Sequence, residues 1–345
     1  MLRPFERSLS IALVAIVISA MPLLAWSADA ESTKAPQWMQ PPSGALVVDG
    51  LLQAAAGWTQ LDDSAIDGRP VLSAHRVRLW LRGKAHERLR YVIQFSGDRV
   101  GADNLALLQG KSLSQSRFPT VLDAVLQADL LSSGALRVTG GFFRPSVGRE
   151  NNTIVPALPS HEASLSATLA RRGSVQHGHG RAAGLNLGGH VRFGSIGLVY
   201  QAGIFAPLRS GTSSTGVAYT DSLGASASPL TAGNLVVTFG DVTQFRAGDL
   251  LWMGNPWDFN PSGTLGVSAS YQGETDQWAQ STVMTGFGSV QWRGLFADAE
   301  WVQAMRESAS GTVLTNRAWH VRLGYNIKLD TGLLSPFAML TEMSS

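Results

Sequence analysis

The sequence of 345 residues contains no cysteine and few charged side chains. The absence of cysteine excludes disulfides, thiolate metal sites and cysteine nucleophiles. Charged residues make up 15% of the chain, compared with about 25% in typical soluble domains. Lysine occurs only at Lys34, Lys84, Lys111 and Lys328, so arginine supplies almost all the positive charge. Arginine is suited to bidentate recognition of phosphate or carboxylate, while the net charge of +2 does not indicate a polyanionic partner.

Long hydrophobic runs are also lacking, except near the amino terminus. There, Arg3 and Arg7 precede an apolar stretch that ends at Trp26 and is followed by Ala28-Asp29-Ala30. This order predicts a secretory signal peptide over residues 1–30, with a retained anchor helix as the alternative. No other segment approaches the roughly 18 to 20 apolar residues of a membrane helix. If the mature chain lies in a membrane, it must cross as strands.

Arginine alternates with apolar residues in two successive segments, 75–82 and 88–95. Successive side chains of a strand point to opposite faces. One face therefore carries arginine and the other carries residues such as Val77, Leu79 and Ile93. A cationic face toward water and an apolar face toward lipid are typical of an outer-membrane barrel. The arginines that share the first face are Arg76, Arg78, Arg82, Arg88 and Arg90.

The rest of the chain predicts an all-β, transmembrane antiparallel β-barrel over residues 45–345, after a polar periplasmic lead over residues 31–44. We expect strands near 45–57, 71–83, 87–96, 120–131, 134–143, 182–193, 195–205, 233–241, 263–271, 280–292, 294–304, 314–327 and 332–342. Long and short connections alternate through the first seven, as in outer-membrane barrels. The long segment 242–262 breaks this rule, so it hides either a strand pair or an aromatic-rich turn. An odd count of about thirteen predicts a shortened chain or a miscounted strand.

Several short motifs resemble the phosphate-selective porin O/P family. The segment from Gly140 to Glu150, Gly-Gly-Phe-Phe-Arg-Pro-Ser-Val-Gly-Arg-Glu, is similar to a family strand end that carries a glycine-phenylalanine-x-x-proline run followed by a glutamate. The resemblance continues through 181–189, 200–205, 292–295, 300–301, 323–325 and 335–337. It implies a sixteen-stranded trimeric barrel in the outer membrane of a Gram-negative bacterium, whose basic pore passes anions such as phosphate. The chain departs from the family by stopping soon after Pro336-Phe337.

We therefore expect a porin for passive diffusion of small inorganic anions, in contact with outer-membrane lipid and without a cofactor. Pore-lining candidates are the five arginines above together with Arg192 and Arg322. Conduction requires binding that is favourable but weak enough for release. The bland alternative is that these arginines pair with carboxylates across strands.

The long connection 144–181 is the candidate constriction, because loops of this length are usually functional or mobile. Its middle carries a helix-start signal at 160–165. We expect the loop to fold into the lumen, with an exposed extracellular loop as the alternative. Its basic residues are Arg144, Arg149, Arg171 and Arg172.

Other functions find less support in the sequence. His177-Gly178-His179 lacks a nearby carboxylate or cysteine and makes a poor metal site. No hydrolase elbow, phosphate loop or zinc-protease motif is present, so no catalytic residue is predicted. Scattered serine, histidine and aspartate could still converge in space as a hydrolase. Nucleic-acid binding is disfavoured because the basic residues form no contiguous patch with stacking aromatics. A non-transporting barrel (scaffold or receptor) and an inactive truncated porin remain alternatives.

Overall fold

A computed structural model describes residues 18–19, 46–59, 69–97, 120–153, 163–175, 180–206, 228–240, 260–275, 278–329 and 332–345. Two compact units are distinguished, and each is described by itself. Within the described residues, no helix has the length and apolar character needed to cross a membrane. The predicted signal peptide lies outside the described residues, apart from the two-residue strand β1 (Ile18–Ser19), which pairs antiparallel with β2 (Leu46–Thr59).

Unit 1 contains most of β2 and the part of β3 (Arg69–His86) that ends at Leu79. In this part of β3, Arg76 and Arg78 are buried, whereas the adjacent Leu79 is 42% exposed. The two faces of β3 therefore differ as the alternation of arginine and apolar residues predicts.

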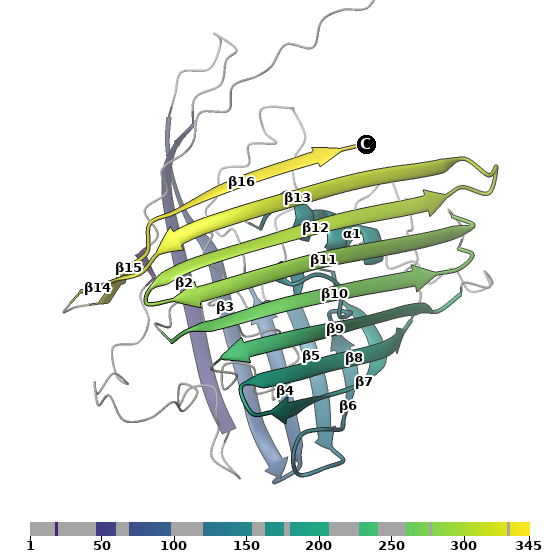
Figure 1. The fold of residues 1–345 in the computed structure, drawn as a ribbon, viewed down its shortest axis with the longest axis horizontal. Helices are drawn as coiled ribbons and strands as arrows, with labels where there is room; N and C mark the ends of the chain where they lie inside the picture. The colour runs from purple at the N-terminus through teal and green to yellow at the C-terminus, as the bar shows by residue number, and fades with distance from the viewer. Residues whose placement is uncertain are drawn as a thin grey trace, which may run out of the picture. The chain divides into compact units, whose positions relative to one another are not determined.

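Unit 2 is a meander in which each strand hydrogen-bonds to the next along the chain (Figure 1). Its neighbours are antiparallel wherever the register is given, from β5 to β13 and on to β16. The predicted all-β antiparallel fold, with the strand order of a transmembrane β-barrel, is confirmed. The strands are β4 (Leu89–Ser96), β5 (Thr120–Asp129), β6 (Arg137–Phe143), β7 (Ala182–Phe193), β8 (Ile196–Phe205), β9 (Leu230–Gly240), β10 (Ser262–Gln272), β11 (Gln280–Trp292), β12 (Leu295–Glu307), β13 (Val313–Tyr325) and β16 (Phe337–Ser344).

In the unit 2 sheet, polar side chains are buried and apolar side chains are exposed, which is the reverse of the arrangement in soluble proteins. On β10, Leu265 and Val267 are 64% and 59% exposed, while Ser268, which points to the other face, is buried. On β13, His320 and Arg322 are buried, and the apolar residues that alternate with them are exposed. We call the buried, polar side the inner face. Apolar side chains that point away from the polar interior suit contact with lipid.

One predicted strand boundary is wrong near the end of the chain. The segments expected at 314–327 and 332–342 are separated by a two-stranded hairpin of β14 (Ile327–Leu329) and β15 (Gly332–Leu334). Pro336 lacks an amide hydrogen and cannot donate to a ladder. At Asn326 the backbone N–H donates to Gly294 O at 2.8 Å, and its side chain accepts from the Ser335 hydroxyl at 2.7 Å. These contacts end β13 at Tyr325.

The anomalous connection 242–262 joins strands that are direct neighbours. Gly240 of β9 lies opposite Ser262 of β10, so no strand pair separates β9 from β10 in the sheet. Whether this connection forms an aromatic-rich turn falls on residues 241–259, which lie outside the described residues.

The connection between β6 and β7 contains the 3-10 helix η3 (Glu150–Asn152) and the helix α1 (Leu165–Ser174). Ser164 caps α1, and its hydroxyl accepts from Ala167 N at 3.1 Å, in agreement with the helix-start signal at 160–165. α1 contacts β11, β12 and β13 most extensively. At Gly173 a Cβ atom would lie 2.7 Å from Val283 Cγ2, so this close approach requires glycine.

Candidate functional site: an inward loop held by a buried ionic cluster

The segment after β6 runs across the inner face of unit 2 and contacts several strands in turn. The Ser146 hydroxyl donates to Gln201 of β8, and Gly148 N donates to the Ser268 hydroxyl of β10 at 2.7 Å. Arg149 N donates to Glu300 Oε1 of β12 at 2.8 Å, and Glu150 N donates to Oε2 at 3.3 Å. The side chain of Glu300 thus accepts from two consecutive amides at the start of η3.

Gly148 is required where this segment approaches β12. Its φ is +78°, a left-handed conformation that favours glycine. A Cβ atom at this position would meet Glu300 Oε1 at 2.6 Å and Ala170 Cβ at 3.2 Å. Sequence reasoning noted this glycine only as part of a family motif, because its backbone conformation has no unique local signal.

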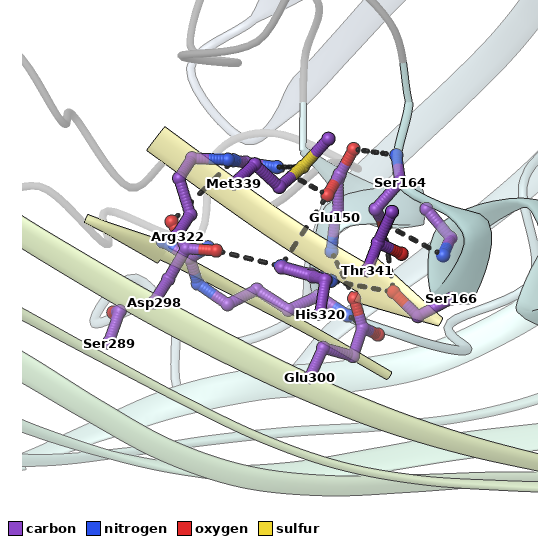
Figure 2. Close-up of polar contacts among 12 residues, drawn as sticks. Glu150, Ser164, Ser166, Ser289, Asp298, Glu300, His320, Arg322, Met339 and Thr341 are labelled. Atoms are coloured by element: carbon purple, nitrogen blue, oxygen red, sulfur yellow. Dashed lines mark hydrogen bonds and ion pairs between the residues drawn. The ribbon is translucent and has the colours of Figure 1, made fainter. Parts of the chain in front are cut away.

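Glu150 and Arg322 form the centre of a buried ionic cluster between the loop and β13 (Figure 2). Arg322 Nη2 donates to Glu150 Oε2 at 2.7 Å, and Arg322 Nη1 lies 3.5 Å from Asp298 Oδ2. The second oxygen of Glu150 accepts from Ser164 N at 2.9 Å, just before α1. Removing charges from water is costly unless they are paired and hydrogen-bonded. Here Arg322 is paired with two carboxylates, and the Glu150 carboxylate accepts hydrogen bonds at both oxygens. Glu150 therefore ties η3, α1 and β13 together.

His320 extends the cluster on the same strand. One ring nitrogen, Nε2, lies 2.8 Å from Asp298 Oδ1, and Nδ1 lies 2.6 Å from the Ser166 hydroxyl of α1. Serine, histidine and aspartate have therefore converged, as the hydrolase alternative requires. Ser166 is 0% exposed, however, and its hydroxyl also contacts that of Ser164 at 2.8 Å. These contacts connect α1 to β13 through the buried Ser166 side chain.

The carboxy-terminal end of α1 is attached to the sheet by Arg306 of β12. Its Nη2 donates to Arg172 O at 2.5 Å, and its guanidinium lies 5.4 Å from the centroid of the Trp278 ring. Cations near the end of a helix interact favourably with its last carbonyls. The Arg172 side chain is exposed and that of Arg171 is partly buried at this end of the helix.

The structure places the predicted constriction loop on the inner face, although it assigns different roles to its arginines. Arg144 donates to the carbonyl of Asn151 within the loop. Arg149 Nη1 lies 3.7 Å from Asp298 Oδ1 and so belongs to the ionic cluster. Of the four predicted residues, Arg172 is the one with an exposed side chain.

The arginines predicted to line the pore are not equivalent. Arg82 is partly buried, whereas Arg88 is exposed in the hairpin turn between β3 and β4. Arg90 Nη2 lies 2.6 Å from Asp129 Oδ2 of β5, and Arg137 of β6 contacts the other oxygen of the same carboxylate at 2.5 Å. For Arg90 the bland alternative of cross-strand carboxylate pairing is therefore observed.

Arg192 and Arg322 also differ from the simple picture of a free cationic wall. Arg192 is exposed at the end of β7, where its Nε donates to Gly194 O at 2.8 Å. Arg322 is fully buried between two carboxylates. Arg322 is thus a structural cation of the loop attachment in this structure.

Sequence reasoning missed the acidic half of the cluster as a site. Asp298 and Glu300 alternate with apolar residues along β12, and both are buried on the inner face. Their alternation with apolar residues indicates their face, but no local signal identifies Glu150 as the partner of β13. In the part of the chain that the structure describes, no group of three or more histidine or acidic residues could hold a metal ion. His177 and His179 lie outside the described residues.

Comparison with known proteins yields structural neighbours only. No family model and no curated protein matches the chain. A loop L8 deletion mutant of OmpT, an outer membrane protein of Vibrio cholerae, has a TM-score of 0.41 and 12% identity, covering 87% of this chain and 95% of that chain. The trimer form of in-vitro folded OmpT has the same TM-score and identity, covering 87% and 89%. Outer-membrane expressed OmpT has a TM-score of 0.38 and 12% identity, covering 88% and 89%. Similarity at this level carries no argument about function.

Proposed function

We propose that the chain is an outer-membrane porin through which small inorganic anions diffuse passively. The observation that carries the proposal is the reversed arrangement of faces along the strands. Polar and charged side chains are buried on the inner face of β10 and β13, whereas large apolar side chains are exposed on the opposite face. Strands that are apolar toward lipid and polar toward a lumen are the pattern of transmembrane barrels.

The preference for anions rests on the arginines of β3. Arg76 and Arg78 share the polar face of this strand, and Arg82 follows on the same side. A guanidinium keeps its charge at all physiological pH values and binds phosphate in bidentate fashion. Phosphate as a permeant ion, membership of the phosphate-selective porin O/P family and a trimeric assembly belong to the same proposal. They are supported by the motif resemblance between 140 and 337.

The inward loop would then narrow the conducting path. η3 and α1 occupy the inner face at β10 to β13, held there by Glu150, Glu300 and Arg322. Because the cluster is buried and its charges are paired, we assign it to positioning the loop. The exposed Arg172 at the end of α1 is the loop cation available to a passing anion.

The test is conductance in planar bilayers with a KCl gradient. We expect a reversal potential whose sign indicates chloride selectivity. We also expect added phosphate to reduce the chloride current. Selectivity for potassium would overturn the anion proposal. Failure to form channels at all would overturn the porin proposal.

A non-transporting barrel is the second candidate, and one observation favours it. Arg90, Arg137, Arg181 and Arg322 each contact a carboxylate, so these arginines can be explained by structural pairing alone. In this case the loop acts as a permanent plug. Insertion into bilayers without any conductance would support this reading over the porin.

A further inference from the structure

The short-turn edge of the unit 2 sheet carries cations next to exposed aromatic side chains. We define this edge as the β7–β8 and β11–β12 turns and the ends of the strands between them. Ser195 O accepts from Gly240 N at 3.0 Å, and Gly294 O accepts from Asn326 N at 2.8 Å. Gly240 in turn lies opposite Ser262, which lies opposite Gln291 next to the second turn. Both turns are therefore on one edge of the same sheet.

The same combination of residues occurs at both turns. At the first turn, exposed Arg192 precedes Phe193, which is 66% exposed. At the second turn, Trp292 is 54% exposed and is followed by exposed Arg293. Aromatic girdles of membrane barrels lie where hydrocarbon meets headgroups. The arginine beside each aromatic residue would therefore lie at the depth of the lipid phosphates.

Both arginine side chains are held at the edge by contacts within their turns. Arg192 Nε donates to Gly194 O at 2.8 Å. The Arg293 guanidinium lies 5.1 Å from the centroid of the Trp292 ring, a cation–π contact. Holding a side chain in place before binding lowers the entropic cost of binding a ligand. Neither arginine forms a carboxylate pair among the ion pairs seen in the described residues.

We propose that this edge binds the phosphodiester headgroups of anionic phospholipids in the leaflet that it faces. The charge of the edge is complementary to such lipids, because cations outnumber acids among its described residues and those of the β3–β4 turn (87–88) and of β14. The cations are Arg88, Arg192, Arg293 and Lys328, and the acid is Glu87. Guanidinium groups recognise phosphate oxygens through paired N–H donors, and the adjacent aromatic ring inserts beside the acyl chain. The inference rests on the proposed membrane location and is independent of ion conduction.

The test uses the full chain folded into vesicles that contain phosphatidylglycerol in phosphatidylcholine, followed by extraction and mass spectrometry of the lipid retained per chain. The double variant Arg192→Gln/Arg293→Gln is compared with Arg317→Gln, which removes an exposed cation away from this edge. A fall of about fivefold or more in retained phosphatidylglycerol for the first variant, with the second unchanged, is expected. Such a change corresponds to about 1 kcal/mol.

Four results would count against the proposal. Equal retention by both variants would mean that the edge is not a headgroup site. Displacement of the lipid by millimolar inorganic phosphate would identify a site for free phosphate instead. A chain that does not insert into vesicles would also overturn the membrane location. Insertion with normal conductance but without phosphatidylglycerol retention would overturn this inference alone.

Discussion

Glu150 Oε2 lies 2.7 Å from Arg322 Nη2, although 172 residues separate the two along the chain. This pair links the 3-10 helix of the inward loop to β13, and both side chains are buried. The position of the loop therefore depends on a small number of charges, and substitution of these residues can test it.

Glu150→Gln should loosen the loop and weaken the fold. The substitution leaves the Arg322 guanidinium buried with a weaker partner, and removal of one member of a buried ion pair costs about 3 to 5 kcal/mol. We expect a lower free energy of unfolding in urea and a larger single-channel conductance. Glu342→Gln, which alters an exposed carboxylate of β16 that accepts from Trp319, is the matched control. Unchanged conductance and stability for Glu150→Gln would show that the pair does not hold the loop.

Gly148→Ala should have a similar effect on conductance without changing any charge. The added Cβ would lie 2.6 Å from Glu300 Oε1, at a residue with φ of +78°. A strained backbone of this kind costs about 1 to 3 kcal/mol, which the segment can avoid by moving away from β12. Gly194→Ala is the control, since its φ is +61° but nothing lies within 4 Å of the added atom. Equal conductance of the two variants would contradict the requirement for close approach to Glu300.

Arg76→Gln/Arg78→Gln should move the reversal potential toward that of a non-selective pore. Both side chains belong to the polar face of β3, and a loss of two positive charges lowers the local concentration of anions. The measurement is the reversal potential in a KCl gradient. Arg317→Gln is the control, because Arg317 is exposed on the apolar face of β13. If the double variant keeps the original selectivity, these arginines do not contribute to an anion path.

Val267→Arg should prevent or weaken folding into bilayers. Val267 is 59% exposed on the apolar face of β10, and a basic residue on the lipid face costs about 2 to 4 kcal/mol at the bilayer midplane. Ser289→Arg, on the inner face of β11 and partly buried, should be better tolerated. The yield of folded protein in vesicles distinguishes them. Greater damage from Ser289→Arg would reverse the assignment of the two faces.

Ser166→Ala should not change hydrolytic activity, because we expect none from Ser166 in the original chain. The hydroxyl contacts His320 Nδ1, but Ser166 is a fully buried residue of α1. A serine-directed phosphonate probe should therefore label neither the original chain nor the variant, as judged by intact mass. Stoichiometric labelling that disappears in Ser166→Ala would restore the hydrolase reading.

The strands could be predicted because their side-chain alternation is local. The period of two in residues 262–272 of β10 alone indicates which side chains point inward. Ser164 likewise gives a local start signal for α1. The pairing of Glu150 with Arg322 could not be predicted, since it depends on how far the loop reaches across β10 and β12. The exposed positions of Arg88 and Arg192 were missed for a related reason: alternation indicates the face of a residue but not its height along the strand.

The attachment of the inward loop also constrains the order in which the chain acquires its structure. Neighbouring strands of the meander can pair early during folding, because their separation in sequence is small. The carboxylate of Glu150, by contrast, has no ionic partner until β13 has been added to the sheet. If the loop docked on the sheet before β13 was added, the Glu150 charge would be buried without a partner. We therefore expect loop docking to be a late event in assembly. Pulse proteolysis during refolding should cleave the β6–β7 connection until the β12–β13 hairpin is protected.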